Sequence, residues 1–411
     1  MTEKRVFDFE TQLNKLQAVF NKNINTEIMA SKTYDAVFSV AENSGGSEFE
    51  VVALEKDFLK HGEGIVRALK DAGVKYSVLL FSVADLNFTK PKKIFGLKSS
   101  EIIILGGKEL ISYALFYASN NTKNVHAVLT EPYVEGLLGN TVTVPDGGFV
   151  KVITVSKLKT LIFDKTILAK SNSNAVAYSY IKCTGKLITL IDYKLDLLIG
   201  VKTLQREHYD RARLAIALIN NIKTFANPIE VLAYASLLNA EVLASSNVLT
   251  GGGQRNIAHA LELQLPTADR GDVALVSLDR AIKLYHAFFV NDFSSVLSVA
   301  DYTGDVNKIS KISNKDSAYF YSNIKIPSVK RKNMLSKLIS LTRAGFIKET
   351  SQLMSILLDV KKNYMRFKGQ KTVTNFKYVQ LKNAVQLAPY LTSETTVLTL
   401  LRDFGVLNTL K

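Results

Sequence analysis

Residues 101–117 read EIIILGGKELISYALFY. An isoleucine-rich run ends at Gly106 and Gly107, and a segment whose apolar residues recur with helical spacing follows. A strand that turns into a helix through glycines is typical of a parallel α/β sheet, where the backbone of the turn can approach a phosphate. The motif is weak, because it lacks the third glycine of a dinucleotide fingerprint and a Walker lysine in register. It predicts either a phosphate-binding turn or a plain strand-to-helix connection.

The same alternation runs through the first 167 residues. Apolar runs rich in valine and isoleucine predict further strands at 37–41, 50–54, 76–81 and 125–130. Amphipathic segments between them, such as 55–73 and 109–120, predict helices. Strands that alternate with helices of this length imply βαβ crossovers and a mostly parallel sheet. We therefore predict an α/β, Rossmann-like domain over residues 1–167.

From about Lys165 the pattern changes to long helical periodicity. The predicted helices cover 173–199, 205–224, 228–247, 255–263, 271–299, 332–345, 347–367, 376–388 and 394–404. Four prolines, Pro228, Pro266, Pro327 and Pro389, fall at the boundaries of these segments, where proline is tolerated. We predict a second, all-α domain over residues 168–411.

Composition limits the class of protein. Apolar residues make up 47% and charged residues 22% of the 411 residues, which is close to the average of folded globular proteins. The one cysteine, Cys183, excludes an internal disulfide and an all-cysteine metal site within one chain. The first residues are charged where a signal peptide needs an apolar stretch, and no 18 apolar residues run together. We expect a cytoplasmic protein without a membrane span.

The net charge of +15 favours anionic partners: nucleic acid, phosphorylated metabolites, acidic lipid surfaces or an acidic protein. Basic clusters lie at 90–93, 329–333 and 360–371. The last is the best nucleic-acid candidate, because Tyr364 and Phe367 interleave with five cations. No zinc-finger, RNP or helix-turn-helix signature accompanies it. The alternative for each cluster is a solvated face.

Local motifs for metal or nucleophilic chemistry are missing. The five histidines are His61, His126, His208, His259 and His286, and no two stand three or four residues apart. An HExxH-like helix and a serine nucleophile elbow are also absent. Each histidine, taken alone, fits a surface or packing position better than a metal ligand.

Five segments together resemble one family. They are LGGKELISYALFYAS (105–119), VLTEPYVEGL (128–137), IKCTGKLITLIDYKL (181–195), the stretch 250–288 that begins TGGGQRNIAHALEL, and LTSETTVLTLLRDFGVL (391–407). In this order they are similar to motifs of the zinc- and NAD(P)-dependent glycerol-1-phosphate dehydrogenases, within the larger group of iron-containing alcohol dehydrogenases and dehydroquinate synthases. The resemblance spans nearly the whole chain. It implies a dehydroquinate synthase-like architecture of two domains with a cleft between them.

The resemblance also implies a chemistry from which this chain departs. The family holds a metal with one aspartate and two histidines, and the metal polarises the substrate oxygen while a hydride passes to or from the nicotinamide. At the matching positions this sequence has Lys182, Arg255 and Arg270. Lysine and arginine have no lone pair for a divalent cation at neutral pH, so we expect no metal here. The three cations could instead hold a phosphate, carboxylate or developing alkoxide, or they could point to solvent or pair with nearby acids.

The matches at the nucleotide end are partial. Gly106, Gly107 and Thr130 match family positions that contact the cofactor, so the resemblance implies NAD(P). Glu109, however, stands where the family has a small residue, and we expect its side chain to collide with a bound pyrophosphate or repel it. Other polar matches pair along two predicted helices: Lys186 with Asp192, and His259 with Glu262.

These observations leave two main hypotheses. The first is a diverged relative that has lost the family reaction and keeps an anion-binding cleft for a regulatory, assembly or partner role. The alternative is a metal-independent enzyme, for example an NAD(P)-linked oxidoreductase, that acts on a phosphorylated polyol or sugar. In that enzyme Lys182, Arg255 and Arg270 would hold the substrate charge, and Lys186 or His259 would move a proton. A nucleic-acid or membrane-surface role through dispersed charge comes third, and the family resemblance implies a homo-oligomer.

Overall fold

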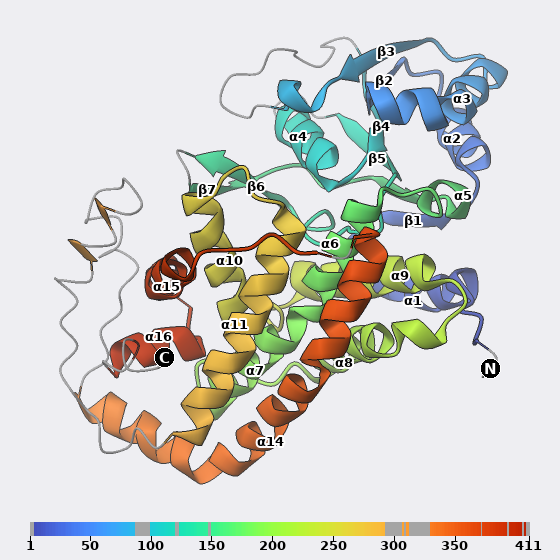
Figure 1. Ribbon diagram of the computed structural model, residues 1–411. Coiled ribbons are helices and arrows are strands. Elements are labelled where there is room, and N and C mark those ends of the chain that lie inside the picture. The colour runs from blue at the N-terminus through green and yellow to red at the C-terminus, as the bar shows by residue number, and fades with distance from the viewer. Residues whose placement is uncertain are drawn as a thin grey trace. The chain divides into compact units, whose positions relative to one another are not determined.

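The computed structural model describes residues 4–86, 99–119, 123–146, 149–291, 306–307, 310–311, 329–370, 372–392, 394–404 and 407 (Figure 1). Contacts divide the chain into two compact units. Unit 1 comprises Met1–Ser179 and Arg213–Asn247, and unit 2 comprises Tyr180–Ala212 and Val248–Lys411. The domain boundary at 167/168 stays a prediction from the sequence pattern. The two units are described separately below.

Unit 1 is built on a six-stranded sheet with the order β1-β8-β5-β4-β2-β3, in which every neighbouring pair is parallel. Its strands are β1 (Glu27–Ala30), β2 (Phe49–Leu54), β3 (Tyr76–Phe81), β4 (Glu101–Gly106), β5 (Asn124–Leu129) and β8 (Thr160–Phe163). A separate antiparallel hairpin pairs β6 (Thr141–Asp146) with β7 (Phe149–Thr154). The predicted α/β class is confirmed, although the sequence pattern had not indicated β1, β8 or the hairpin.

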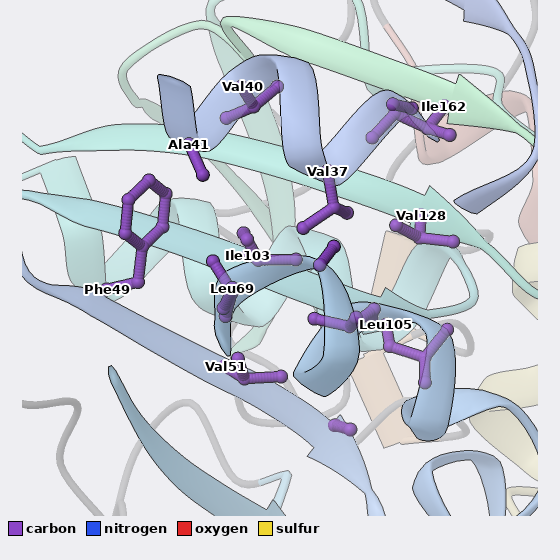
Figure 2. Packing of buried hydrophobic residues seen from close by; sticks show 14 of the residues in the cluster. Val37, Val40, Ala41, Phe49, Val51, Leu69, Ile103, Leu105, Val128 and Ile162 are labelled. Atoms are coloured by element: carbon purple, nitrogen blue, oxygen red, sulfur yellow. The ribbon is translucent and has the colours of Figure 1, made fainter. Parts of the chain in front are cut away.

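Four helices of unit 1 contact this sheet: α1 (Phe9–Asn23), α2 (Thr33–Glu42), α3 (Glu55–Asp71) and α4 (Lys108–Ala118). Helix α9 (Pro228–Ser245) packs on α1 and on α5 (Lys165–Leu168). Figure 2 shows Val37 and Val40 of α2 above Val51 of β2 and Ile103 of β4, within one buried cluster. All six residues of β4 are buried, as expected for a central strand of a sheet covered on both faces.

The strand predicted at 37–41 is wrong, because these residues form part of α2. Val37, Val40 and Ala41 are spaced three and four residues apart, so a helix places them on one face, and that face is buried. A short valine-rich run is compatible with either structure when it is read alone. The other four predicted strands match β2, β3, β4 and β5 to within one residue at each end.

The order of the strands creates a switch point at the carboxyl ends of β2 and β4. The chain leaves β2 through α3 toward β3 on one side, and it leaves β4 through α4 toward β5 on the other side. Connections that depart in opposite directions open a crevice between neighbouring strands, and ligands of open α/β sheets bind in such crevices. The turn of Gly106 and Gly107 lies at this point.

The regular secondary structure among the described residues of unit 2 consists of helices. Its helices are α7 (Lys186–Leu198), α10 (Gly253–Gln264), α11 (Arg270–Val290), α14 (Val329–Lys368), α15 (Tyr378–Leu387) and α16 (Val397–Asp403), with the last residues of α6 (Ser173–Thr184) and the first of α8 (Arg206–Asn220). The predicted helical second part of the fold is confirmed.

The division of two predicted helical regions differs from the structure, and residues 292–299 of the helix predicted at 271–299 lie outside the described residues. The segments 332–345 and 347–367 form a single helix, α14, since an exposed glycine such as Gly345 costs a helix only about 1 kcal/mol. The segment 173–199 is divided at Gly185 into α6 and α7. A Cβ atom at Gly185 would lie 2.7 Å from Oε1 of Gln254, so glycine allows α10 to approach here.

Candidate functional site

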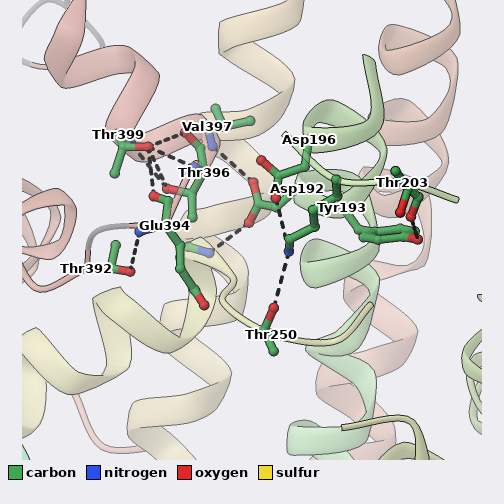
Figure 3. A network of polar contacts seen from close by, with 12 residues as sticks. Asp192, Tyr193, Asp196, Thr203, Thr250, Thr392, Glu394, Thr396, Val397 and Thr399 are labelled. Atoms are coloured by element: carbon green, nitrogen blue, oxygen red, sulfur yellow. Dashed lines mark hydrogen bonds and ion pairs between the residues drawn. The ribbon is translucent and has the colours of Figure 1, made fainter. Parts of the chain in front are cut away.

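The first turn of α10 is fixed by one buried carboxylate. Asp192 of α7 accepts hydrogen bonds from the backbone N–H of Gly253 (3.1 Å) and of Val397 (3.0 Å), and from Oη of Tyr285 (2.7 and 2.8 Å), as Figure 3 shows in part. This single side chain thereby joins α7, α10, α11 and α16. Burial raises the pKa of Asp192 to about 7, although the three donors act to lower it. The backbone of Arg255, two residues after Gly253, is positioned by this network.

The charges of Arg255 and Lys182 act on the same carboxylate, that of Glu262. Burial raises the pKa of Glu262, whereas the charges of Lys182 and Arg255 act to lower it. Glu262 follows Arg255 on α10 by two helical turns, so both side chains lie on the same face of that helix. Arg255 is exposed, and Lys182 and Glu262 are half-buried. Two of the three predicted anion-binding residues therefore lie within electrostatic reach of one acid.

The charge of Arg255 also acts on a second carboxylate, that of Glu394, in the segment that leads into α16. Burial raises the pKa of Glu394, and the charges of Lys202, Arg255 and Lys186 oppose this rise. Lys202 is itself paired with Asp196 at 3.0 Å. Lys186 is buried, with 8% of its surface exposed, so its charge is held away from solvent beside Glu394.

The glycines before α10 pack against the chain's own side chains. Gly251 has a φ of +84°, and a Cβ atom there would overlap the carboxylate of Glu394. Gly252 has a φ of +110°, and a Cβ atom there would lie 2.6 Å from Oγ1 of Thr189. Both positions need glycine for their conformation as well as for space. The glycines of this turn therefore leave room for Glu394 and for Thr189 of α7 next to the start of α10.

The structure brings together some of the predicted site residues. The charges of Lys182 and Arg255 both act on Glu262, and those of Arg255 and Lys186 both act on Glu394. His259 is half-buried and lies one turn after Arg255 on α10. Arg270 is the exposed first residue of α11, and the charges that act most strongly on Glu262 and Glu394 do not include it. The role of Arg270 at a shared anion site stays a prediction.

Arg270 nevertheless begins a firmly held turn. Asp272, two residues on, is 2% exposed and accepts hydrogen bonds from Nζ of Lys368 (2.7 Å), Oη of Tyr364 (2.7 Å) and both the N–H (2.9 Å) and hydroxyl (2.6 Å) of Thr374. Burial acts to raise the pKa of Asp272, but these hydrogen bonds outweigh it and lower the pKa below its ordinary value. The start of α11 is thus tied to the end of α14.

These residues do not fit a catalytic metal. The three positions at which the resemblance places the ligands carry an ammonium and two guanidinium groups, and none of these donates a lone pair to a cation. Within the described ranges, no group of three or more histidine, cysteine, aspartate or glutamate side chains could hold a metal ion.

The turn of Gly106 and Gly107 in unit 1 is also held by a carboxylate. Gly107 is the N-cap of α4, and the next N–H, that of Lys108, donates to Oε1 of Glu131 at 2.7 Å. A Cβ atom at Gly107 would overlap the carboxylate of Glu131. The N–H of Thr130 donates to the carbonyl of Gly106 at 3.2 Å, so all three predicted cofactor contacts lie together. Glu109, expected to interfere with a pyrophosphate, is exposed, and the carboxylate at the turn is that of Glu131.

The two aromatic residues of the basic segment 360–371 make contacts within the protein. Tyr364 is fully buried and donates to Asp272, and the ring of Phe367 packs against Tyr180 with centroids 5.3 Å apart. Neither ring is presented for stacking on bases, so a nucleic-acid role of this segment rests on charge alone. The cluster 90–93 and Lys371 lie outside the described residues. Across the part of the chain that the structure describes, no helix is long and apolar enough to cross a membrane.

Comparison with known proteins identifies the fold. No protein-family model matches the sequence, and no curated protein matches it. The structure is similar to that of NADH-dependent butanol dehydrogenase A from Thermotoga maritima, with 12% identity, a TM-score of 0.51, and 94% of this chain and 98% of that chain covered. A sulfoacetaldehyde reductase from Bifidobacterium kashiwanohense in complex with NAD⁺ gives 12% identity, a TM-score of 0.56, and coverage of 93% and 96%. A probable glycerol dehydrogenase from Sinorhizobium meliloti gives 11% identity, a TM-score of 0.53, and coverage of 93% and 96%.

At this level of identity the likeness concerns the fold. Solved structures with this fold include an iron-containing alcohol dehydrogenase and glycerol dehydrogenases. The fold that the resemblance implies is therefore confirmed: this chain has the α/β and helical architecture seen in structures of iron-containing alcohol dehydrogenases.

Proposed function

We propose that this chain keeps the fold of the iron-containing alcohol dehydrogenases without their metal-dependent reaction and binds an anionic small molecule through Lys182, Lys186 and Arg255. A phosphorylated compound fits the set best, because a phosphate accepts several charge-assisted hydrogen bonds at once. The bound anion would serve a regulatory, assembly or partner role. Arg270 and His259 remain candidate contributors, since one begins α11 and the other shares α10 with Arg255.

The observation that carries this proposal is that the charge of Arg255 acts on two carboxylates, those of Glu262 and Glu394. Arg255 is exposed, so a solute can reach its guanidinium group, while the buried Lys186 supplies a fixed positive charge beside Glu394. Burial raises the pKa of both Glu262 and Glu394. Such carboxylates take up a proton readily when a second anion arrives, which leaves the cluster net positive. Anion binding should therefore strengthen as the pH falls.

Thermal unfolding with inorganic phosphate and glycerol phosphate tests the proposal. A ligand present at about 100 times its dissociation constant adds about 2.7 kcal/mol of stability, so the native midpoint should rise by several degrees. Sodium chloride at equal ionic strength should give a smaller rise. The Arg255→Ala variant should lose the response, because it removes the one cation shared by both carboxylates.

Arg206→Ala is the matched control. Arg206 is an exposed arginine of the same unit, and it lies beside Asp210 at 4.0 Å. Its removal should leave the response to phosphate intact. An equal response in native protein and Arg255→Ala would contradict the proposal. Turnover of a phosphorylated polyol by the metal-free protein with NAD(P) would instead favour the alternative of a metal-independent enzyme, with Lys186 or His259 as the proton carrier.

A further inference from the structure

Two acidic side chains follow strands at the switch point of unit 1. Asp57 lies in the first turn of α3, directly after β2, and Glu131 lies two residues after the end of β5. The two carboxylates are close enough that the charge of Asp57 raises the pKa of Glu131, in addition to the larger effect of burial. Between them is the turn of Gly106 and Gly107, after β4. This is the position at which open α/β sheets bind their ligands.

Glu131 makes the contact that a phosphate oxygen makes at such a turn. The N-terminus of a helix offers free N–H groups and a positive partial charge, and both favour an anion. In α4 the N-cap is Gly107, which has no side chain to satisfy these groups, and Oε1 of Glu131 accepts from the N–H of Lys108 at 2.7 Å. The carboxylate lies directly over Gly107, in the space that the missing side chain leaves open.

The charges of several lysines act on this pair of acids. Lys56 and Lys108 act to lower the pKa of Glu131, and Lys56 and Lys60 act to lower the pKa of Asp57. Burial is the largest influence on both acids, and it raises both values. If Glu131 were absent, the crevice would present several lysines and an uncapped helix N-terminus to one remaining carboxylate.

We propose that the carboxylate of Glu131 occupies the phosphate position in unit 1 and thereby excludes a dinucleotide from the native chain. The nicotinamide cofactor that the resemblance implies does not fit here as the turn stands, because its pyrophosphate would need the N–H group and the space that Glu131 uses. This inference goes beyond the proposed function, which concerns cations of unit 2.

Calorimetric titration with NAD⁺ and with inorganic pyrophosphate at low salt tests the inference. Arg255→Ala, which lacks the proposed anion site of unit 2 and keeps Glu131, should bind both probes weakly. Adding Glu131→Ala removes the competing carboxylate, and the double variant should bind each probe at least about tenfold more tightly. Glu131→Gln keeps an oxygen that accepts from Lys108 but loses the charge, so it should show a smaller gain, and it decides the question if the alanine variant does not fold. Adding Asp57→Asn should strengthen binding further.

Glu109→Ala is the control, because it removes the same charge from the first turn of α4 at an exposed position. It should bind the probes as weakly as Arg255→Ala alone does. Arg255→Ala protein that binds NAD⁺ as tightly as the double variant with Glu131→Ala would overturn the inference, and so would the absence of any gain in both variants of Glu131. Each comparison is made in the Arg255→Ala background, which removes the proposed anion site of unit 2, so this inference and the proposed function can fail independently.

Discussion

Replacing Asp272 by alanine should lower the free energy of unfolding by about 3–5 kcal/mol, the range expected when one partner of a buried ion pair is removed. Nζ of Lys368, with only 4% of its side chain exposed, would lose its closest acceptor and keep only Asp269 at 3.3 Å. Tyr364 and Thr374 would lose an acceptor as well. Urea unfolding of native protein and variant at neutral pH measures the difference.

Asp269→Ala is the appropriate comparison for this effect. Asp269 is the N-cap of the same helix, accepts from the N–H of Asp272 at 2.9 Å, and is about one-third exposed. Loss of an N-cap costs about 1 kcal/mol. A loss in Asp272→Ala no larger than that in Asp269→Ala would show that the contact between α11 and α14 does not stabilise the start of α11 as described.

Replacing Asp192 by asparagine should remove a pH-dependent loss of stability that reaches about 4 kcal/mol in the native protein. Burial raises the pKa of Asp192 from the ordinary 3.8 to about 7, so between these values the folded chain holds a proton that the unfolded chain has released. The stabilisation is therefore complete below about pH 4 and is lost as the pH rises through 7. Asparagine keeps the shape of the side chain and cannot titrate.

Urea unfolding at pH 5 and at pH 8 measures this contribution. About 3 kcal/mol of the native loss should fall in this interval and be missing from Asp192→Asn. Other acids also have raised pKa values and act in the same direction, but they are present in both proteins: Asp57, Glu131, Asp196, Glu262 and Glu394. Equal pH dependence of the native protein and the variant would mean that Asp192 is ionised throughout this range.

The fold could be predicted largely from local patterns. Four parallel strands and the helices between them have the periodicity of their final structures, because burial selects residues with that spacing. The strand predicted at 37–41 was wrong, because five residues rich in valine are compatible with a buried strand and with the buried face of a helix. The short strands β1 and β8 lie at or next to one edge of the sheet, and each has only four residues in which a pattern could show.

The candidate site could be predicted only in part. Lys182 and Arg255 were identified through the family resemblance, and in the structure the charges of both act on Glu262. The carboxylates Glu131 and Glu394 lie inside the segments that carry the resemblance, yet no pattern in the sequence assigns them these contacts. Such contacts join distant parts of the chain: Asp192 bonds to backbone groups 61 and 205 residues away. Local spacing holds no information about pairs so far apart.

On the proposed function, cations of unit 2 have replaced a metal and bind an anion. Equilibrium dialysis of the purified protein against zinc and inorganic phosphate in parallel tests it most directly, with Arg255→Ala beside the native chain. We expect the native protein to retain phosphate but no zinc above the buffer blank, and Arg255→Ala to retain neither. One zinc ion retained per native chain, or phosphate retained equally by both proteins, would contradict the account.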